Sequence, residues 1–243
     1  MRYIYFSPHL DDAVFSCGGI IAQQVAQGKS VEVWSFFTAD PPRTDLTPFA
    51  KILHKRWGKS GNPYQVRRKE DMDACTLLSV NFRHFRFLDC IYRRYPGSHT
   101  PVVKKTADLF KPVCEKETEL LTVITHTLRQ HLDPDDVIIL PLGVGSHIDH
   151  LLVKNLAGDL ENERLYYPDY PYAAKIKSIN DLTLPQDAVK YHYLLTGAEL
   201  RLWQKSAGCY QSQVSSFWKS AEEMKADIAR YAFSLVGSTI WSF

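Results

Sequence analysis

The segment YIYFSPHLDD, residues 3–12, decides the fold class of this 243-residue chain. Its first four residues, Tyr3 to Phe6, are aromatic or β-branched, a composition typical of a buried strand. The polar residues that follow end this strand, and Gly18 to Gln27 has the apolar spacing of a helix. Gly28 ends the helix, and Val31 to Thr38 predicts the next strand. The segment therefore begins a β-α-β unit.

The same alternation continues along the chain. A helix, a strand, a second helix and a short, wholly apolar strand are expected at residues 63–79, 84–88, 118–131 and 137–140. This order predicts an α/β fold of Rossmann-like topology, with a mostly parallel sheet and helices on both faces. In such folds ligands bind at the carboxyl ends of the strands. We expect a single domain over residues 1–243, less regular from about residue 160.

Two further regions have weaker patterns. Residues 39–61, rich in Pro, Thr, Lys and Gly, are expected to form a long surface loop. Near the C-terminus a strand is expected at 191–195, and helices are expected near 198–207 and 217–232. These elements would complete the fold around the sheet.

The composition excludes several classes of protein. Lys and Arg (29) nearly balance Asp and Glu (27) without a basic block, so no nucleic-acid partner is expected. The apolar runs are too short for a signal peptide or for a membrane span of about 20 residues. Five scattered cysteines, none in a Cys-x-x-Cys motif, favour buried free thiols over disulfides or a thiolate zinc site. We therefore expect a cytoplasmic protein.

Two polar clusters follow predicted strands. The first is Ser7-Pro8-His9-Leu10-Asp11-Asp12, and the second is Gly145-Ser146-His147-Ile148-Asp149-His150. Because the carboxyl ends of parallel strands meet at one edge of a sheet, both clusters can face the same crevice. Together they offer three imidazoles and three carboxylates, and two adjacent carboxylates repel one another without a cation. The clusters favour a catalytic metal site with three ligands, an open position, and spare groups for proton transfer.

These residues resemble a known family. Pro8-His9-Leu10-Asp11-Asp12 with Gly18-Gly19 is similar to the Pro-His-Pro-Asp-Asp…Gly-Gly signature of the PIG-L/LmbE-like N-acetylglucosaminyl deacetylases. His147-Ile148-Asp149-His150 matches the second signature of that family, His-x-Asp-His. The similarity extends to Arg67-x-x-Glu70, to Phe87-Leu88-Asp89, and to residues 167–172 and 210–213. Leu10 and Ala13 replace the proline and the glutamate that are usual in the family, and neither is a ligand position there.

The resemblance implies a zinc-dependent amide hydrolase that removes an N-acetyl group from an N-acetylglucosamine-type sugar or glycoconjugate. It implies that His9, Asp12 and His150 bind Zn²⁺, with Fe²⁺ as the alternative metal in cells. Asp11 would be the general base. His147 would stabilise the oxyanion or act as an acid, and Asp149 would orient a histidine.

Arg67 and Asp89 are the candidate substrate-binding residues, because charged donors and acceptors suit the hydroxyl groups of a sugar. For Arg67 the alternative is a surface ion pair of little energetic consequence. The aromatic run Tyr166–Tyr172 is expected to pack between the sheet and the C-terminal part, with stacking on a sugar ring as the alternative.

Other functions stay open on the same residues. A non-haem iron enzyme also uses two histidines and a carboxylate, but such sites usually lie on all-β scaffolds. A non-catalytic sugar-binding protein would not need Asp11 beside a full ligand set. Hydrolysis of an ester or a lactam would use the same attack on a carbonyl, and assembly into a homo-oligomer is also open.

Overall fold

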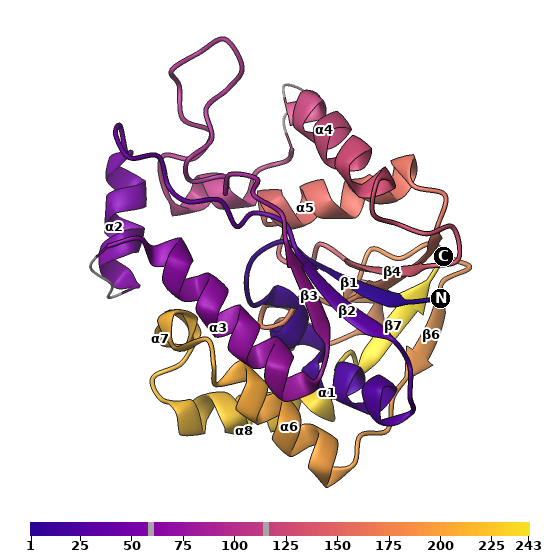
Figure 1. The fold of residues 1–243 in the computed structure, drawn as a ribbon. Helices are drawn as coiled ribbons and strands as arrows, with labels where there is room; N and C mark the ends of the chain where they lie inside the picture. Colours follow the sequence, from indigo (N-terminus) through magenta and orange to yellow (C-terminus); the bar gives the residue numbers. More distant parts are fainter. Residues whose placement is uncertain (58–60, 114–116) are drawn as a thin grey trace.

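The computed structural model describes residues 1–57, 61–113 and 117–243. Within these residues seven strands form one sheet, in the order β3-β2-β1-β4-β5-β7-β6 (Figure 1). The five strands β1 to β5 are parallel, and β7 runs antiparallel to β5 and β6. The strands are β1 (Tyr3–Ser7), β2 (Val31–Ser35), β3 (Asn81–His84), β4 (Val137–Pro141), β5 (Glu163–Tyr167), β6 (Val189–His192) and β7 (Thr239–Ser242).

Helices cover both faces of this sheet. In Figure 1, α4 and α5 lie on one face, and α1, α3 and α6 lie on the other. The eight α-helices of the described residues are α1 (Asp12–Ala26), α2 (Pro48–Arg56), α3 (Pro63–Leu78), α4 (Thr118–Arg129), α5 (Ile148–Asn155), α6 (Gly197–Ala207), α7 (Gln211–Phe217) and α8 (Ala221–Ala232). The predicted α/β class with a mostly parallel sheet is confirmed.

The centre of the sheet determines where a ligand can bind. β1 pairs with β4 in parallel, with Tyr3 opposite Val137 and Tyr5 opposite Ile139. From β1 the chain moves outward to β2 and β3, and then returns to β4 and continues outward on the other side. The boundary between β1 and β4 is therefore the point where the strand order reverses, and a crevice opens beyond the carboxyl ends of these two strands.

The glycine pair Gly18-Gly19 lies inside α1, which begins six residues earlier than predicted, at Asp12. A Cβ atom on Gly18 would lie 2.3 Å from Cδ1 of Trp203 in α6, and one on Gly19 would lie 2.4 Å from Cδ1 of Leu195. The pair therefore allows close packing of α6 on α1 rather than a helix start. The polar cluster misled the prediction, because Asp12 belongs to both the cluster and the first helical turn.

The loop predicted over residues 39–61 contains a helix, α2. The Thr47 hydroxyl accepts a hydrogen bond from the backbone N–H of Ala50 at 3.0 Å, and Pro48 occupies the first helical turn. Phe49 and Leu53 bury their side chains in an apolar cluster beside the strand ends. This burial stabilises α2 where the composition alone predicted a loop. Residues 58–60 lie outside the described residues.

The third strand is also displaced from its predicted position. β3 covers Asn81–His84, whereas residues 84–88 were expected. Phe85 and Phe87 still donate backbone hydrogen bonds to Ser35 and Phe36, but the regular pairing with β2 ends at His84. The aromatic composition of this segment reflects packing of Phe85 against Phe36, whose ring centres are 5.4 Å apart, rather than strand register.

The C-terminal part departs most from the predicted boundaries. β5 was not predicted, and β6 ends at His192, whereas the strand was expected to continue to residue 195. The helix expected near 217–232 corresponds to α8, which begins at Ala221, where the Ser220 hydroxyl caps it. The preceding helix, α7, was not predicted. β6 and β7 nevertheless extend the same sheet as the N-terminal strands.

Two expectations from the composition can be compared with the structure. In the described part of the chain, no helix is both long and apolar enough to cross a membrane. Cys17, Cys75 and Cys90 are buried and free, as predicted, and Cys209 is free but only half-buried. Cys114 lies outside the described residues.

Candidate active site

The crevice beyond β1 and β4 brings the two polar clusters together. His9 lies in the loop between β1 and α1, whereas His147 and His150 lie at the start of α5, which follows β4. The three imidazole rings contact one another, with centres 5.0 to 5.5 Å apart. One nitrogen atom of each ring lies within 4.8 Å of the others. Two histidines far from His9 in the sequence therefore form one compact group with it.

Asp12 lies between two of these rings. Its Oδ2 atom is 3.1 Å from Nδ1 of His9 and 3.3 Å from Nε2 of His150. The same oxygen accepts a hydrogen bond from the backbone N–H of His9 at 2.7 Å, which fixes the turn before α1. Two nitrogen atoms and one carboxylate oxygen thus converge on one point, a donor set that suits zinc.

A second carboxylate lies behind each of these imidazoles. Nε2 of His9 is 3.1 Å from Oδ2 of Asp149, and Nδ1 of His150 is 2.6 Å from Oδ1 of Asp169. Each ring therefore engages a buried carboxylate with one nitrogen and turns its other nitrogen toward Asp12. Metal-ligating histidines are typically held in this way, so the residues present fit a divalent metal.

The electrostatics of the site point in the same direction. Burial alone would lower the pKa of His9, but the carboxylates of Asp12 and Asp149 raise it well above its usual value. Burial would likewise lower the pKa of His150, and Asp12 and Asp169 raise it to about 10. The carboxylates thus create a strong demand for positive charge at the point where the ring nitrogens converge. A divalent cation meets that demand.

Asp11 has a different environment from its neighbour. Burial and the adjacent charge of Asp12 raise the pKa of Asp11 to about 7, and the opposing effect of Arg67 is smaller. Nη2 of Arg67 lies 3.6 Å from Oδ2 of Asp11. A carboxyl group with a pKa near neutrality is suited to take up and return a proton at the reacting centre.

His147 is the third imidazole, and a backbone group rather than a carboxylate orients it. Its Nδ1 accepts a hydrogen bond from the backbone N–H of Asp149 at 3.3 Å, which leaves the ring proton on Nε2. Burial and the neighbouring rings of His9 and His150 lower the pKa of His147 well below its usual value. A neutral ring with an Nε2–H group can donate a hydrogen bond to an oxygen that develops negative charge.

Arg67 is buried, so the surface ion pair considered from the sequence is wrong. Its guanidinium lies 5.1 Å from the ring centres of both Trp57 and Tyr64, and its exposed fraction is 3%. Asp89 is also buried and accepts a hydrogen bond from the Tyr64 hydroxyl at 2.5 Å. Both charged residues line the same cleft as the histidines.

This cleft has a volume of about 260 Å³. Its floor is polar and consists of buried residues, among them His9, Asp11, Arg67, Asp89 and His150, and much of the remaining lining is apolar. The apolar lining residues are Leu53, Trp57, Ile91, Leu109, Phe110 and Phe217, of which Phe110 and Phe217 are exposed and form part of the rim. Tyr166, Tyr167 and Tyr170 pack in the core, as expected, but Tyr172 lines the cleft, with its ring 5.9 Å from that of His150.

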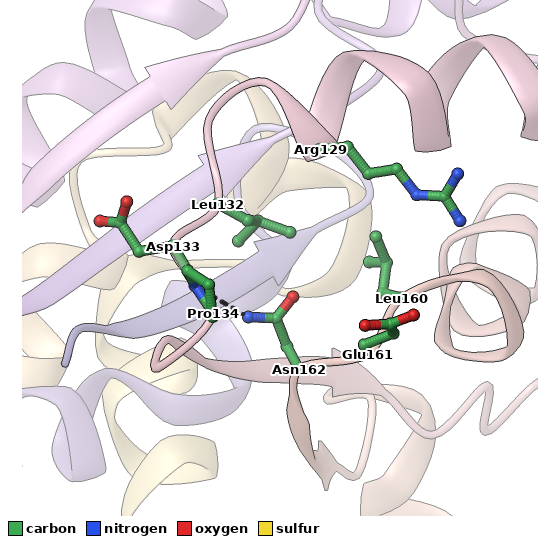
Figure 2. Close-up of a pocket in the computed structure, with 7 residues that line it drawn as sticks. All are labelled: Arg129, Leu132, Asp133, Pro134, Leu160, Glu161 and Asn162. Atoms are coloured by element: carbon green, nitrogen blue, oxygen red, sulfur yellow. Dashed lines mark hydrogen bonds between the residues drawn. The ribbon is translucent and has the colours of Figure 1, made fainter.

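A larger cavity, of about 540 Å³, lies at the opposite edge of the sheet (Figure 2). It is lined by the segments that precede β4 and β5, including Arg129, Asp133, Glu161 and Asn162. Figure 2 shows the Asn162 amide turned toward the backbone of Asp133, where it donates a hydrogen bond at 2.8 Å. No imidazole lines this cavity among the described residues, so its size alone does not identify it as a catalytic site.

Comparison with known proteins agrees with the two motifs. The family model for GlcNAc-PI de-N-acetylase (PIG-L) matches residues 4–160, so the chain belongs to this family. Two relatives are each named 2′-N-acetylparomamine deacetylase. The protein from Streptomyces fradiae is 26% identical over 187 residues, which cover 74% of this chain but only 60% of the relative. The protein from Niallia circulans is 25% identical over 190 residues, which cover 70% and 67%.

Solved structures of deacetylases share the fold. A deacetylase from the biosynthesis pathway of teicoplanin superposes with a TM-score of 0.83 at 24% identity, covering 99% of this chain and 97% of that one. The deacetylase of the A40926 pseudoaglycone superposes with a TM-score of 0.75 at 25% identity, covering 99% and 96%. These likenesses confirm the α/β architecture over nearly the whole chain.

Sequence reasoning missed two residues that support the site. Asp169 was noted within an aromatic run that resembles the family, but it was given no role. It holds His150 and also accepts hydrogen bonds from the backbone N–H groups of Gly143 and Val144. Arg93 was not among the candidate residues, although it is buried against Asp149. Asp169 could have been suspected because it is the one charged residue in the aromatic run Tyr166–Tyr172. No sequence pattern pointed to Arg93.

Proposed function

We propose that this protein is a zinc-dependent hydrolase that removes an N-acetyl group from an N-acetylglucosamine-type sugar or glycoconjugate. His9, Asp12 and His150 would hold the metal. The observation that carries the proposal is the pair of carboxylate-backed imidazoles, His9 and His150, that both turn toward Asp12. Membership of the PIG-L family and the names of the relatives support the same chemistry.

Zinc held by His9, Asp12 and His150 would supply a Lewis acid and would lower the pKa of a water molecule. Residues of the protein transfer the proton and stabilise the negative charge. Asp11 lies on the cleft floor and takes the proton of the attacking water, for which its raised pKa is suited. The Nε2–H group of His147 donates a hydrogen bond to the carbonyl oxygen as negative charge develops there. Asp11 then returns the proton to the leaving amine, so acetate and a free amino sugar are released.

The shape of the cleft supports a sugar-like substrate. Arg67 and Asp89 provide a charged donor and a charged acceptor on the floor, where they would bind hydroxyl groups. Tyr172 and Phe110, with ring centres 6.1 Å apart, lie beside His147 and His150 and would contact the apolar face of the ring. A volume of about 260 Å³ suits one sugar residue with its acyl group, with the remainder of a larger substrate outside the cleft.

The proposal is tested by measuring metal content and acetate release together. The purified protein is loaded with zinc and assayed on N-acetylglucosamine, an N-acetylated aminoglycoside and an N-acetylated glycopeptide. One zinc per chain and turnover of at least one substrate are expected, and Asp11→Asn should keep the metal and lose turnover. Asp45→Asn is the matched control, since Asp45 lies at the surface.

Each alternative function has its own outcome in this experiment. Activity that requires oxygen and iron would replace the proposal with a non-haem iron enzyme. Zinc binding and sugar binding without acetate release on any substrate would favour a sugar-binding protein. Release of a carboxylic acid only from esters or lactams would keep the mechanism and change the bond.

A further inference from the structure

A second buried arginine, Arg93, lies behind the cleft. Its exposed fraction is 8%, and it does not belong to the residues that line the cleft. Its Nη1 atom is 2.7 Å from Oδ1 of Asp149, and its Nε donates a hydrogen bond to Glu117 at 2.8 Å. The guanidinium also lies 5.0 Å from the centre of the Phe37 ring. Arg93 therefore acts on the site through its neighbours and not by contact with a substrate.

Asp149 connects this arginine to the metal site. Its side chain is completely buried, and its two oxygens face in different directions. Oδ1 is held by Arg93, while Oδ2 accepts a hydrogen bond from the backbone N–H of Cys90 at 3.1 Å and lies 3.1 Å from Nε2 of His9. One carboxylate thus links the guanidinium of Arg93 to the imidazole of His9.

The geometry of this link determines which ring nitrogen of His9 is available to a metal. A carboxylate paired with a guanidinium only accepts hydrogen bonds, so Nε2 of His9 must carry the proton. The Nδ1 lone pair then points at Asp12, 3.1 Å away. Without Arg93, Oδ1 of Asp149 would lose its ion pair, and the charge of this buried carboxylate would be left uncompensated on that side.

We propose that Arg93 is a positioning residue: by holding Asp149 it fixes the Nε2–H tautomer of His9 and keeps Nδ1 directed at the metal position. The inference rests on the proposed function, because it takes His9 as a metal ligand. Arg67, the other buried arginine of the site, has a different part, since it lines the cleft and faces Asp11. Arg67 thus pairs with Asp11 in the cleft, whereas Arg93 pairs with Asp149 behind it.

The test compares Arg93→Met with the parent protein and with Arg94→Met. Arg94 is the matched control, because its guanidinium binds Asp45 at the surface, 2.5 Å away. Zinc affinity is measured by competition with a chromophoric chelator, and exchange of the His9 Nε2–H proton is measured by NMR in the zinc-loaded protein. Arg93→Met should bind zinc about 10 to 100-fold more weakly, with faster proton exchange. Arg94→Met should match the parent, and Arg93→Lys should recover part of the affinity.

Parental zinc affinity and parental proton exchange in a folded Arg93→Met protein would overturn the inference. If that variant does not fold, Asp149→Asn tests the same link from its other end, with the same expected loss and the same contrary result. When the parent binds zinc and releases acetate but these variants keep its affinity, only the role of Arg93 is wrong. A parent that neither binds zinc nor releases acetate refutes the proposed function, and the role of Arg93 with it.

Discussion

Nδ1 of His150 lies 2.6 Å from Oδ1 of Asp169, although the two residues belong to different segments of the sheet edge. The other oxygen of Asp169 accepts hydrogen bonds from the backbone N–H groups of Gly143 and Val144, in the loop that carries the second motif. One carboxylate therefore orients the imidazole and also holds the loop from which α5 begins. Asp169 is therefore part of the candidate site, because it holds both His150 and the loop before it.

Replacement of Asp169 should weaken the metal site. In Asp169→Asn the amide keeps the size of the side chain but loses the charge that holds His150. A loss of about 10 to 100-fold in zinc affinity is expected, the range typical for such outer partners. Competition with a chelator measures this affinity, with Asp181→Asn as the control on an exposed 3-10 helix. Unchanged affinity in Asp169→Asn would show that the contact is only structural.

The ion pair between Arg2 and Asp136 should make stability depend on pH. Burial alone would raise the pKa of Asp136, but hydrogen bonds from Arg2 lower it below its usual value. The stabilisation is therefore present above the pKa of an unfolded aspartate, about 3.9, and is lost as the pH falls through the lower folded value. Urea unfolding between pH 2 and pH 7 should show a shallower loss of stability at acid pH in Asp136→Asn than in the parent.

Asp135→Asn is the control for this prediction. Asp135 is adjacent in sequence, but its side chain is 66% exposed and pairs with the N-terminal amine. Its removal should leave the acid limb of the stability profile close to that of the parent, because exposed ion pairs contribute little. Parallel profiles for the parent and Asp136→Asn would contradict the prediction.

The contact between α1 and α6 leaves no room for a methyl group at Gly18. A Cβ atom there would lie 2.3 Å from Trp203, whose indole N–H also donates to the backbone of Val14 at 2.8 Å. Gly18→Ala should therefore lower the free energy of unfolding by about 1–3 kcal/mol. Gly158→Ala is the control, since nothing lies within 4 Å of its Cβ position. Equal stability of the two variants would argue against this close packing.

The two exposed aromatic residues on the cleft rim should contribute to substrate affinity. Phe110 and Phe217 line the cleft and are 40% and 42% exposed, so a bound substrate can cover both rings. Phe110→Ala and Phe217→Ala should each raise KM by roughly 3 to 10-fold, equivalent to about 0.5–1.5 kcal/mol per aromatic contact, and leave kcat nearly unchanged. Phe233→Ala, at an exposed site away from the cleft, should change neither constant. A fall in kcat alone would place these rings in another role.

The sequence was sufficient for the centre of the site because parallel strands obey a simple rule. Polar residues that follow parallel strands meet at the same edge of a sheet, so both clusters could be expected in one crevice. The resemblance to the PIG-L family singled out His9, Asp12 and His150 within them, and the structure adds that β1 and β4 are neighbours. The roles of these residues stay proposals, but their proximity is a direct result of the strand order.

The supporting residues could not be predicted in the same way. Arg93 and Asp169 lie in irregular segments whose paths depend on the packing of the whole molecule, and neither has a periodic pattern around it. Tertiary burial also explains why α2 forms. Phe49 and Leu53 are buried in an apolar cluster, although the segment has the composition of a loop. Local rules therefore predict the centre of the site better than its surroundings.

The reversal of strand order between β1 and β4 separates two parts of the protein that can change independently. The catalytic floor is anchored to the middle of the sheet, while the rim comes from α2, η1 (Thr106–Phe110) and α7, which lie outside it. We expect substitutions in these outer segments to alter what the cleft admits more than they alter the loops after β1 and β4 that carry the imidazoles. Such a molecule can acquire new substrates by exchanging its periphery while its chemistry is inherited unchanged.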